Sequence, residues 1–273
     1  MRLTAPPEDL DQHILRSYSV LRWFMVGFGF VLPLLLVVGG ISSWWWLKEA
    51  LPVQDSLSAY YHAGNLCIPS RGVYRDLFVG LLAAIGFCLI IYTGFGKLEN
   101  WLLNIAGVSL LGVAFFSTDW PNPAVLESCK LIPGFEPHKA SLLLGLPVSI
   151  HNFSAVIFFF AITLVNFFTA LNTVEIIPNR DKQRFWRSVF QVFRLIMPVS
   201  LGIVLLLLRG DKRLVLWVEW AGIWAFSFYW LLKSIEILST KVDIDIINGK
   251  YEWVQTGKNR RLSRKTDHPP TIP

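Results

Sequence analysis

Six long apolar runs constrain the fold of this chain more than any other feature of its sequence. They lie at residues 23–46, 77–95, 101–118, 144–171, 190–208 and 214–238. About 20 consecutive apolar residues in a helix cross the hydrocarbon core of a bilayer, whereas a β-barrel would show short alternating strands. The sequence therefore predicts an all-α fold, a polytopic membrane helix bundle with six transmembrane helices.

The composition agrees with a membrane protein and argues against nucleic-acid binding. Hydrophobic residues make up 53% of the chain and charged residues only 16%, against about a quarter in soluble domains. The net charge is +6, but the basic residues flank the apolar runs and form no separate basic domain. They are better interpreted as topology signals and lipid contacts. The expected partners are membrane lipids, and the oligomeric state does not follow from the sequence.

The distribution of Lys and Arg predicts the orientation. With six spans both termini lie on one side, and that side holds 17 of the 25 Lys and Arg residues, which makes it cytoplasmic. Loops 49–75, 119–141 and 209–213 then face outward. The predicted domains are a cytoplasmic N-terminal lead at 1–22 with a short surface helix, a transmembrane domain at 23–238, and a basic cytoplasmic tail at 239–273. In the tail, alternating residues around Asn248-Gly249 predict a hairpin.

Two of the three cysteines fall in the predicted outer loops. Cys67 lies in the first loop and Cys129 in the second, and an oxidising exterior would allow them to pair. An inverted topology would instead leave two free thiols. Cys88 lies inside a predicted span and is expected to be a packing residue.

Polar residues gather near the outward ends of four predicted spans. Asp76 begins the second span, Asp119 ends the third, and His151 and Glu219 lie about two turns inside the fourth and sixth. Ionisable groups inside a membrane usually face the bundle interior, a cavity or each other. The sequence thus predicts an outward-facing polar pocket, to which the first loop adds Ser56, Ser58, Tyr60, Tyr61, His62 and Arg75.

Simpler structural roles are also open for these residues. Arg75 and Asp76 would form a salt bridge at a helix start, and His151 would hydrogen-bond across helices. Glu219 needs a proton, water or a cation, and Arg75 is its expected partner.

Two kinds of catalytic centre can be drawn from the same residues. His62 and His151 together with the carboxylates would suit a zinc ion, although the chain has no His-x-x-x-His or His-Glu-x-x-His motif. A nucleophilic arrangement would use Ser58, His62 or His151, and Asp119, but without a Gly-x-Ser-x-Gly elbow.

The chain resembles a group of uncharacterised bacterial six-helix membrane proteins over residues 50–235. The resemblance is carried by Ser56-x-Ser58-x-Tyr60-Tyr61, Arg75-Asp76-x-Phe78-Val79-Gly80, Asn104-x-Ala106-Gly107, Leu111-Gly112-Val113-Ala114, His151-x-x-Ser154-Ala155 and Glu219-x-x-x-x-Trp224-Ala225-Phe226. The layout is distantly similar to the Frag/DRAM/Sfk membrane proteins and more weakly to the CREST hydrolases, which build an intramembrane zinc site. The resemblance implies a multi-pass protein of a bacterial plasma (inner) membrane.

Three functions follow as hypotheses. The first is a non-enzymatic protein that binds a lipid headgroup or small polar ligand through Ser56, Ser58, Tyr60, Tyr61, Arg75, Asp76, Asp119 and Glu219, without a cofactor. The second is a metal-dependent intramembrane lipid amidase or esterase with zinc on His62 and His151. The third is a structural protein whose closed polar network joins the helices.

Overall fold

The computed structural model describes residues 7–42, 53–62, 72–118, 141–145, 148–207, 210–256 and 259–265. Its long helices are α1 (Pro7–Ser42), α3 (Val73–Ile91), α4 (Lys97–Phe115), α6 (Ile150–Thr169), α7 (Arg180–Leu207) and α8 (Leu214–Thr240). The shorter elements are the 3₁₀ helices η1 (Ser58–His62) and η3 (Val174–Ile176), the helix α9 (Val242–Ile247), and the strands β1 (Tyr251–Thr256) and β2 (Asn259–Arg264). Cys67, Asp119 and Cys129 lie outside the described residues, so the predicted disulfide falls there too.

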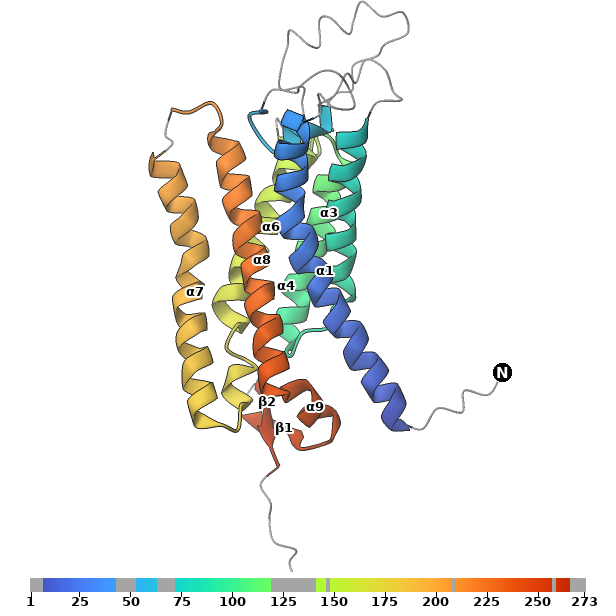
Figure 1. Cartoon of the computed structure of the whole chain (residues 1–273), viewed down its shortest axis with the longest axis vertical. Coiled ribbons are helices and arrows are strands. Elements are labelled where there is room, and N and C mark those ends of the chain that lie inside the picture. The colour runs from blue at the N-terminus through green and yellow to red at the C-terminus, as the bar shows by residue number, and fades with distance from the viewer. Residues whose placement is uncertain are drawn as a thin grey trace, which may run out of the picture.

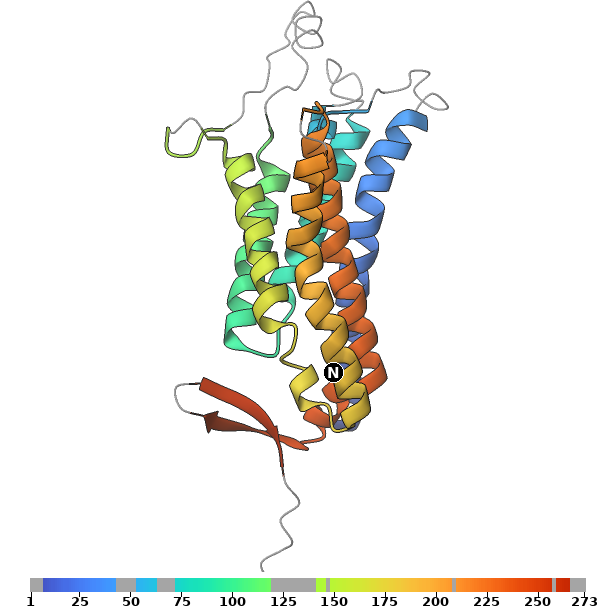
Figure 2. The ribbon, with the colours of Figure 1, turned by 90° about the vertical axis from the view of Figure 1, so that its left-hand side faces the viewer.

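Five of the helices are long and apolar enough to cross a membrane. These stretches are His13–Ile41, Val73–Ile91, Lys97–Phe115, Ile150–Ile176 and Leu214–Thr240. They run side by side as an elongated bundle (Figures 1 and 2), with η1 at one end and α9 at the other. The architecture is that of a multi-pass membrane protein, and the predicted helical fold is confirmed at that level.

The N-terminal lead is not a separate surface helix, so that prediction was wrong. Residues 7–42 form one continuous helix, α1, whose N-terminal end projects beyond the neighbouring helices (Figure 1). Neither Gly nor Pro lies between Glu8 and Arg22, and without a breaker a helix continues past the edge of an apolar run.

Helix α4 packs against α3 on one side and α6 on the other through small residues. A Cβ on Gly107 would lie 2.7 Å from the carbonyl oxygen of Gly86 in α3, and one on Gly112 would lie 2.4 Å from Ser154 Oγ in α6. Small residues allow close backbone contact, which drives helix association in membranes where burial from water cannot.

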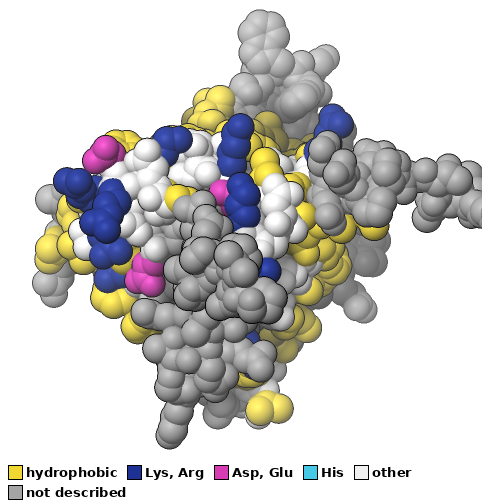
Figure 3. Space-filling view, turned by 90° about the horizontal axis from the view of Figure 1, so that it is seen from below, with side chains coloured by type: hydrophobic (Ala, Val, Ile, Leu, Met, Phe, Trp, Pro, Cys, Tyr) yellow, Lys and Arg dark blue, Asp and Glu magenta, His cyan; other side chains and the backbone are white. Residues whose placement is uncertain are grey.

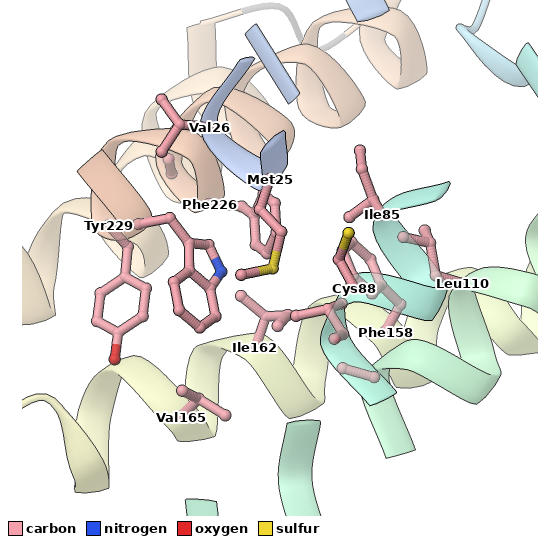
Figure 4. Packing of buried hydrophobic residues seen from close by; sticks show 14 of the residues in the cluster. Met25, Val26, Ile85, Cys88, Leu110, Phe158, Ile162, Val165, Phe226 and Tyr229 are labelled. Atoms are coloured by element: carbon pink, nitrogen blue, oxygen red, sulfur yellow. The ribbon is translucent and has the colours of Figure 1, made fainter. Parts of the chain in front are cut away.

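The remaining helices enclose one apolar core. Helix α1 packs against α3 and α8, and α7 packs along α8. Figure 4 shows side chains from five helices converging in the middle of the bundle: Met25 and Val26 of α1, Ile85 and Cys88 of α3, Leu110 of α4, Phe158, Ile162 and Val165 of α6, and Phe226 and Tyr229 of α8. Cys88 is buried among them, as a packing residue.

The tail contains a hairpin, but not the one that the sequence predicted. Residues 242–247 form the helix α9, and Gly249 follows it with φ of +70°. A left-handed glycine just beyond a helix is a common helix end, so Asn248-Gly249 ends α9 and is not a hairpin turn. Tyr251–Thr256 is a strand as expected, and its antiparallel partner is Asn259–Arg264.

Lys and Arg side chains gather at the end of the bundle that carries α9. Figure 3 shows this end, where several cationic side chains lie on the surface beside few acidic ones. Exposed Arg184 and Arg187 of α7 lie in this part of the fold. The structure therefore places basic residues of distant segments together at one end.

We expect the α3–α4 contact to be sensitive to a single methyl group. Gly107→Ala brings Cβ against backbone atoms of α3 and should lower the free energy of unfolding by about 1–3 kcal/mol. Gly80→Ala in α3 is the matched control, because nothing lies within 4 Å of the added Cβ. Denaturant unfolding in detergent measures both variants, and equal stability of the two would contradict the close contact.

Candidate functional site

The 3₁₀ helix η1 carries the polar residues of the first loop onto the end of the bundle. Ser58, Tyr60 and His62 are buried there. The Ser56 hydroxyl accepts the Ala59 N–H at 2.9 Å, and the Leu216 N–H donates to the carbonyl oxygen of Asp55 at 3.0 Å. The segment is thus held by its own turn and by the first turn of α8.

Glu219 of α8 connects to this segment directly. Its Oε2 accepts the Leu57 N–H at 2.6 Å, and its Oε1 lies 3.1 Å from Ser58 Oγ. Arg75, the partner predicted for Glu219, instead pairs with its neighbour Asp76 at 3.2 Å. The carboxyl group is therefore held by Leu57 and Ser58 and not by a cation of α3, and the predicted pairing was wrong.

Ser58 also contacts His151 of α6. The His151 Nε2 lies 2.9 Å from Ser58 Oγ, and its Nδ1 lies 2.8 Å from the carbonyl oxygen of Phe116. A carbonyl only accepts, so Nδ1 carries a proton and donates. Glu219, Ser58 and His151 thus form one chain of hydrogen bonds from α8 through η1 to α6.

The hydrogen bonds of this chain can be satisfied in two arrangements, which differ in the position of one proton. If Ser58 donates to Glu219, Nε2 of His151 must carry a proton and donate to Ser58. If Ser58 donates to Nε2, Glu219 must carry the proton instead. The first arrangement is an ion pair and the second is neutral, with the same total charge. The hydroxyl of Ser58 is therefore a bridge across which a proton can move between an acid and a base.

His62 makes a similar contact. Its Nε2 lies 2.7 Å from the carbonyl oxygen of Thr118, just beyond the end of α4. The last carbonyls of a helix have no partner within it. His62 and His151 therefore satisfy two carbonyl groups of the segment that leaves α4.

A cavity of about 40 Å³ opens beside Ser58 and Glu219. Its other walls are apolar and come from α1, α3, α4, α6 and α8, including Leu32, Phe78, Leu82, Ala155, Phe158 and Ile223. The site thus combines a polar end, formed by one hydroxyl and one carboxyl group, with an apolar interior.

The other predicted site residues have more local roles. Tyr61 packs against the rings of His62 and Phe78, and Tyr60 packs against Tyr74. Burial raises the pKa of the Tyr60 phenol, so it stays protonated at neutral pH. Arg75 and Asp76 are more exposed, with 35% and 71% of their side chains accessible. The structure therefore brings Ser58, His151 and Glu219 together and leaves Arg75 and Asp76 at the rim of the fold.

Within the described residues, no three of His, Cys, Asp and Glu come close enough to hold an ion.

Comparisons with protein-family models, with curated proteins and with solved structures each find no match.

A second buried polar cluster lies at the opposite end of the bundle. Lys233 and Glu236 of α8 are 1% and 0% exposed, and Lys233 Nζ lies 3.3 Å from Glu236 Oε2. The Thr173 hydroxyl donates to Glu236 at 2.9 Å and also contacts Lys233. The carbonyl oxygen of Ala170 accepts from Lys233 at 3.1 Å. The cluster joins α8 to the end of α6.

Arg22 of α1 and Asp243 of α9 lie close to this second cluster. They are 3.8 Å apart and line a cavity of about 170 Å³ with Tyr18, Tyr92 and Thr93. Burial raises the pKa of Asp243 above its usual range. None of these residues was predicted to form a site, although Lys233 and Glu236 inside an apolar run were a visible signal.

Lys233 should be needed for stability mainly because Glu236 is buried beside it. Lys233→Met leaves an uncompensated carboxylate and should lower stability by about 3–5 kcal/mol. Lys233→Met combined with Glu236→Met removes this pair of charges and should recover part of that loss, since buried Glu99 also interacts with Lys233. Unfolding in detergent measures both, and a double variant as unstable as the single one would contradict the pairing.

Proposed function

We propose that this chain is a six-span membrane protein whose outward-facing pocket binds an amphiphilic ligand, a lipid headgroup or small polar molecule attached to an apolar part. Both termini are cytoplasmic, and the membrane is the inner membrane of a bacterium, as the family resemblance implies. The cavity that ends at Ser58 and Glu219 carries this proposal.

The sixth span is α7. It has 28 residues, about 42 Å of helix, and it runs along α8 (Figure 1). Residues 190–207 contain a single charged residue, Arg194. Its guanidinium lies 4.8 Å from the centre of the Phe167 ring of α6. Length, composition and attachment to the bundle all support a membrane-spanning position.

The distribution of charge supports the orientation. With α7 as a span, the start of α1 and the end of α8, which leads into α9, lie on the same side of the membrane (Figure 1). Lys and Arg gather on that end (Figure 3), and the cytoplasmic side of a membrane protein is the side rich in them. The Ser58–Glu219 end then faces outward.

The cavity supports an amphiphilic ligand over a purely polar one. Its walls are apolar except for Ser58 and Glu219, a composition that ligand pockets share: hydrophobic lining with few polar groups that fix orientation. Glu219 accepts hydrogen bonds when ionised, so the ligand's polar part should carry a hydroxyl or ammonium donor. Arg75, partly exposed at the start of α3 and paired with Asp76, would also attract an anionic part of a headgroup.

Filling the cavity should displace the ligand, and unfolding in detergent checks that the variant still folds. Ala155→Phe places a ring into the apolar cavity that Ala155 lines. We expect lipid that co-purifies with the wild-type chain, measured by mass spectrometry, to fall at least tenfold. Val156→Phe is the matched control, because the neighbouring Val156 is 69% exposed on the outer surface of α6. Loss of lipid in both variants, or in neither, would contradict binding in the cavity.

A second candidate function is acyl transfer by Ser58. The Ser58 Oγ lies 2.9 Å from His151 Nε2, and a carbonyl holds the other ring nitrogen at 2.8 Å. A nucleophile next to an oriented base is the arrangement that activates a serine. Ser58 Oγ would attack an ester carbonyl and pass its proton to Nε2, which would return it to the leaving alcohol. Water would then release the acyl group by the same route.

A fluorophosphonate probe separates this enzyme from a binder. An activated Ser58 should be labelled covalently, with the adduct located by peptide mass spectrometry. Ser58→Ala should abolish labelling and His151→Gln should reduce it at least tenfold, while Ser56→Ala, which removes only a turn contact, should keep it. An unlabelled wild-type chain would exclude the acyl-transfer mechanism and leave the binding proposal standing.

The closed network is also compatible with a structural role, since Glu219, Ser58 and His151 satisfy one another. A purely structural network has no need of an adjoining cavity, so the cavity favours the binder. The zinc hydrolase suggested by the sequence stays a prediction, and so does the family resemblance.

A further inference from the structure

One face of α4 presents a polar side chain where a membrane offers it no partner. Asn104 is exposed on this helix, and no hydrogen bond to its amide occurs among the described residues. It lies seven residues after Lys97 in a span of 19 residues, about 10 Å along the axis from that end. Because the hydrocarbon core is about 30 Å thick, this amide lies at hydrocarbon depth.

The other faces of α4 are already occupied. Gly107 packs against α3 and Gly112 against Ser154 of α6. The remaining face carries large apolar side chains: Trp101 is 70% exposed, Val108 63% and Phe115 58%. In Figure 2, α4 and α6 form one edge of the bundle, so this face is open to the membrane. Asn104 is the polar residue in the middle of an otherwise apolar surface.

The spacing of this face matches a helix–helix contact. Trp101, Asn104, Val108 and Phe115 are separated by steps of three, four and seven residues. That alternation is the a/d repeat of helices packed along one another, and a single Asn at such a position fixes register and partner number. A groove of about 350 Å³ beside Asn104, lined also by Trp101, Ile105, Val108, Ser109 and Ile157, would receive a large side chain.

We propose that the α4 face centred on Asn104 is the interface through which two copies of this chain form a dimer in the membrane. An amide carries both a donor and an acceptor, so two Asn104 side chains related by a two-fold axis satisfy each other. Such an interface is isologous, with the same residues on both subunits. An acyl chain offers neither donor nor acceptor and would leave the amide unsatisfied. Trp101 of each copy would fill the groove of the other.

The test measures self-association in a bilayer. The full-length chain, labelled at a terminal tag with donor or acceptor dye, is reconstituted into phosphatidylcholine vesicles, and energy transfer is followed as lipid dilutes the protein. The wild-type chain should show transfer that falls on dilution. Asn104→Leu should move the midpoint to about tenfold higher protein density, since hydrogen bonds between membrane helices contribute up to about 1–2 kcal/mol in model peptides.

Two variants make the result specific to the amide at this position. Asn104→Gln keeps a donor and an acceptor and should associate more tightly than Asn104→Leu. Asn152→Leu removes another exposed amide, at the start of the neighbouring α6, where water and headgroups are within reach, and should leave the midpoint unchanged. Leu suits a membrane-facing helix, so Asn104→Leu should fold normally. A monomeric wild-type chain, an unchanged midpoint in Asn104→Leu, or an equal shift in Asn152→Leu would overturn the proposal.

Discussion

The carboxyl group of Glu219 holds the η1 end of this bundle together. A polar group away from water must find its partner within the protein, and Glu219 finds it in the Leu57 N–H and the Ser58 hydroxyl. Ser58 then reaches His151 of α6, and His151 holds the carbonyl of Phe116 just after α4. One side chain of α8 thus determines how η1, α6 and the end of α4 meet. A cavity lies beside Ser58 and Glu219.

The sequence was sufficient to predict the long helices and part of this site. Apolar length alone predicted five stretches that the structure shows as membrane-length helices, because the thickness of a bilayer leaves little choice. Ser58, His151 and Glu219 were predicted together, since polar residues inside or beside spans are costly and seek one another. Their depth in the membrane could be counted along the chain, and residues at the same depth were the natural candidates for contact.

Contacts that depend on how each helix is turned about its own axis could not be predicted from the sequence. Arg75 and Glu219 were expected to pair because a carboxylate inside a span needs a cation, yet successive helix residues point about 100° apart and the sequence does not show which way each side chain points. The alternation of apolar and polar residues in the tail also gave a wrong prediction. Residues 242–246 alternate like a strand, but they form the helix α9, which begins just after the left-handed Lys241 that ends α8. Lys233 and Glu236 lie near the end of an apolar run, where charged residues are common, so the pattern did not indicate their 3.3 Å contact.

The two polar clusters differ in a way that assigns them different roles. At the α9 end, Lys233 and Glu236 are fully buried opposite charges, and moving either partner would leave the other uncompensated. Such a pair fixes structure. At the η1 end, the chain through Ser58 is satisfied with its proton on either Glu219 or His151, so a new donor or acceptor beside it can be accommodated by moving that proton. Ser58 and Glu219 also line a cavity, where such a ligand group could approach. The cluster that can rearrange its hydrogen bonds is therefore the one suited to receive a ligand.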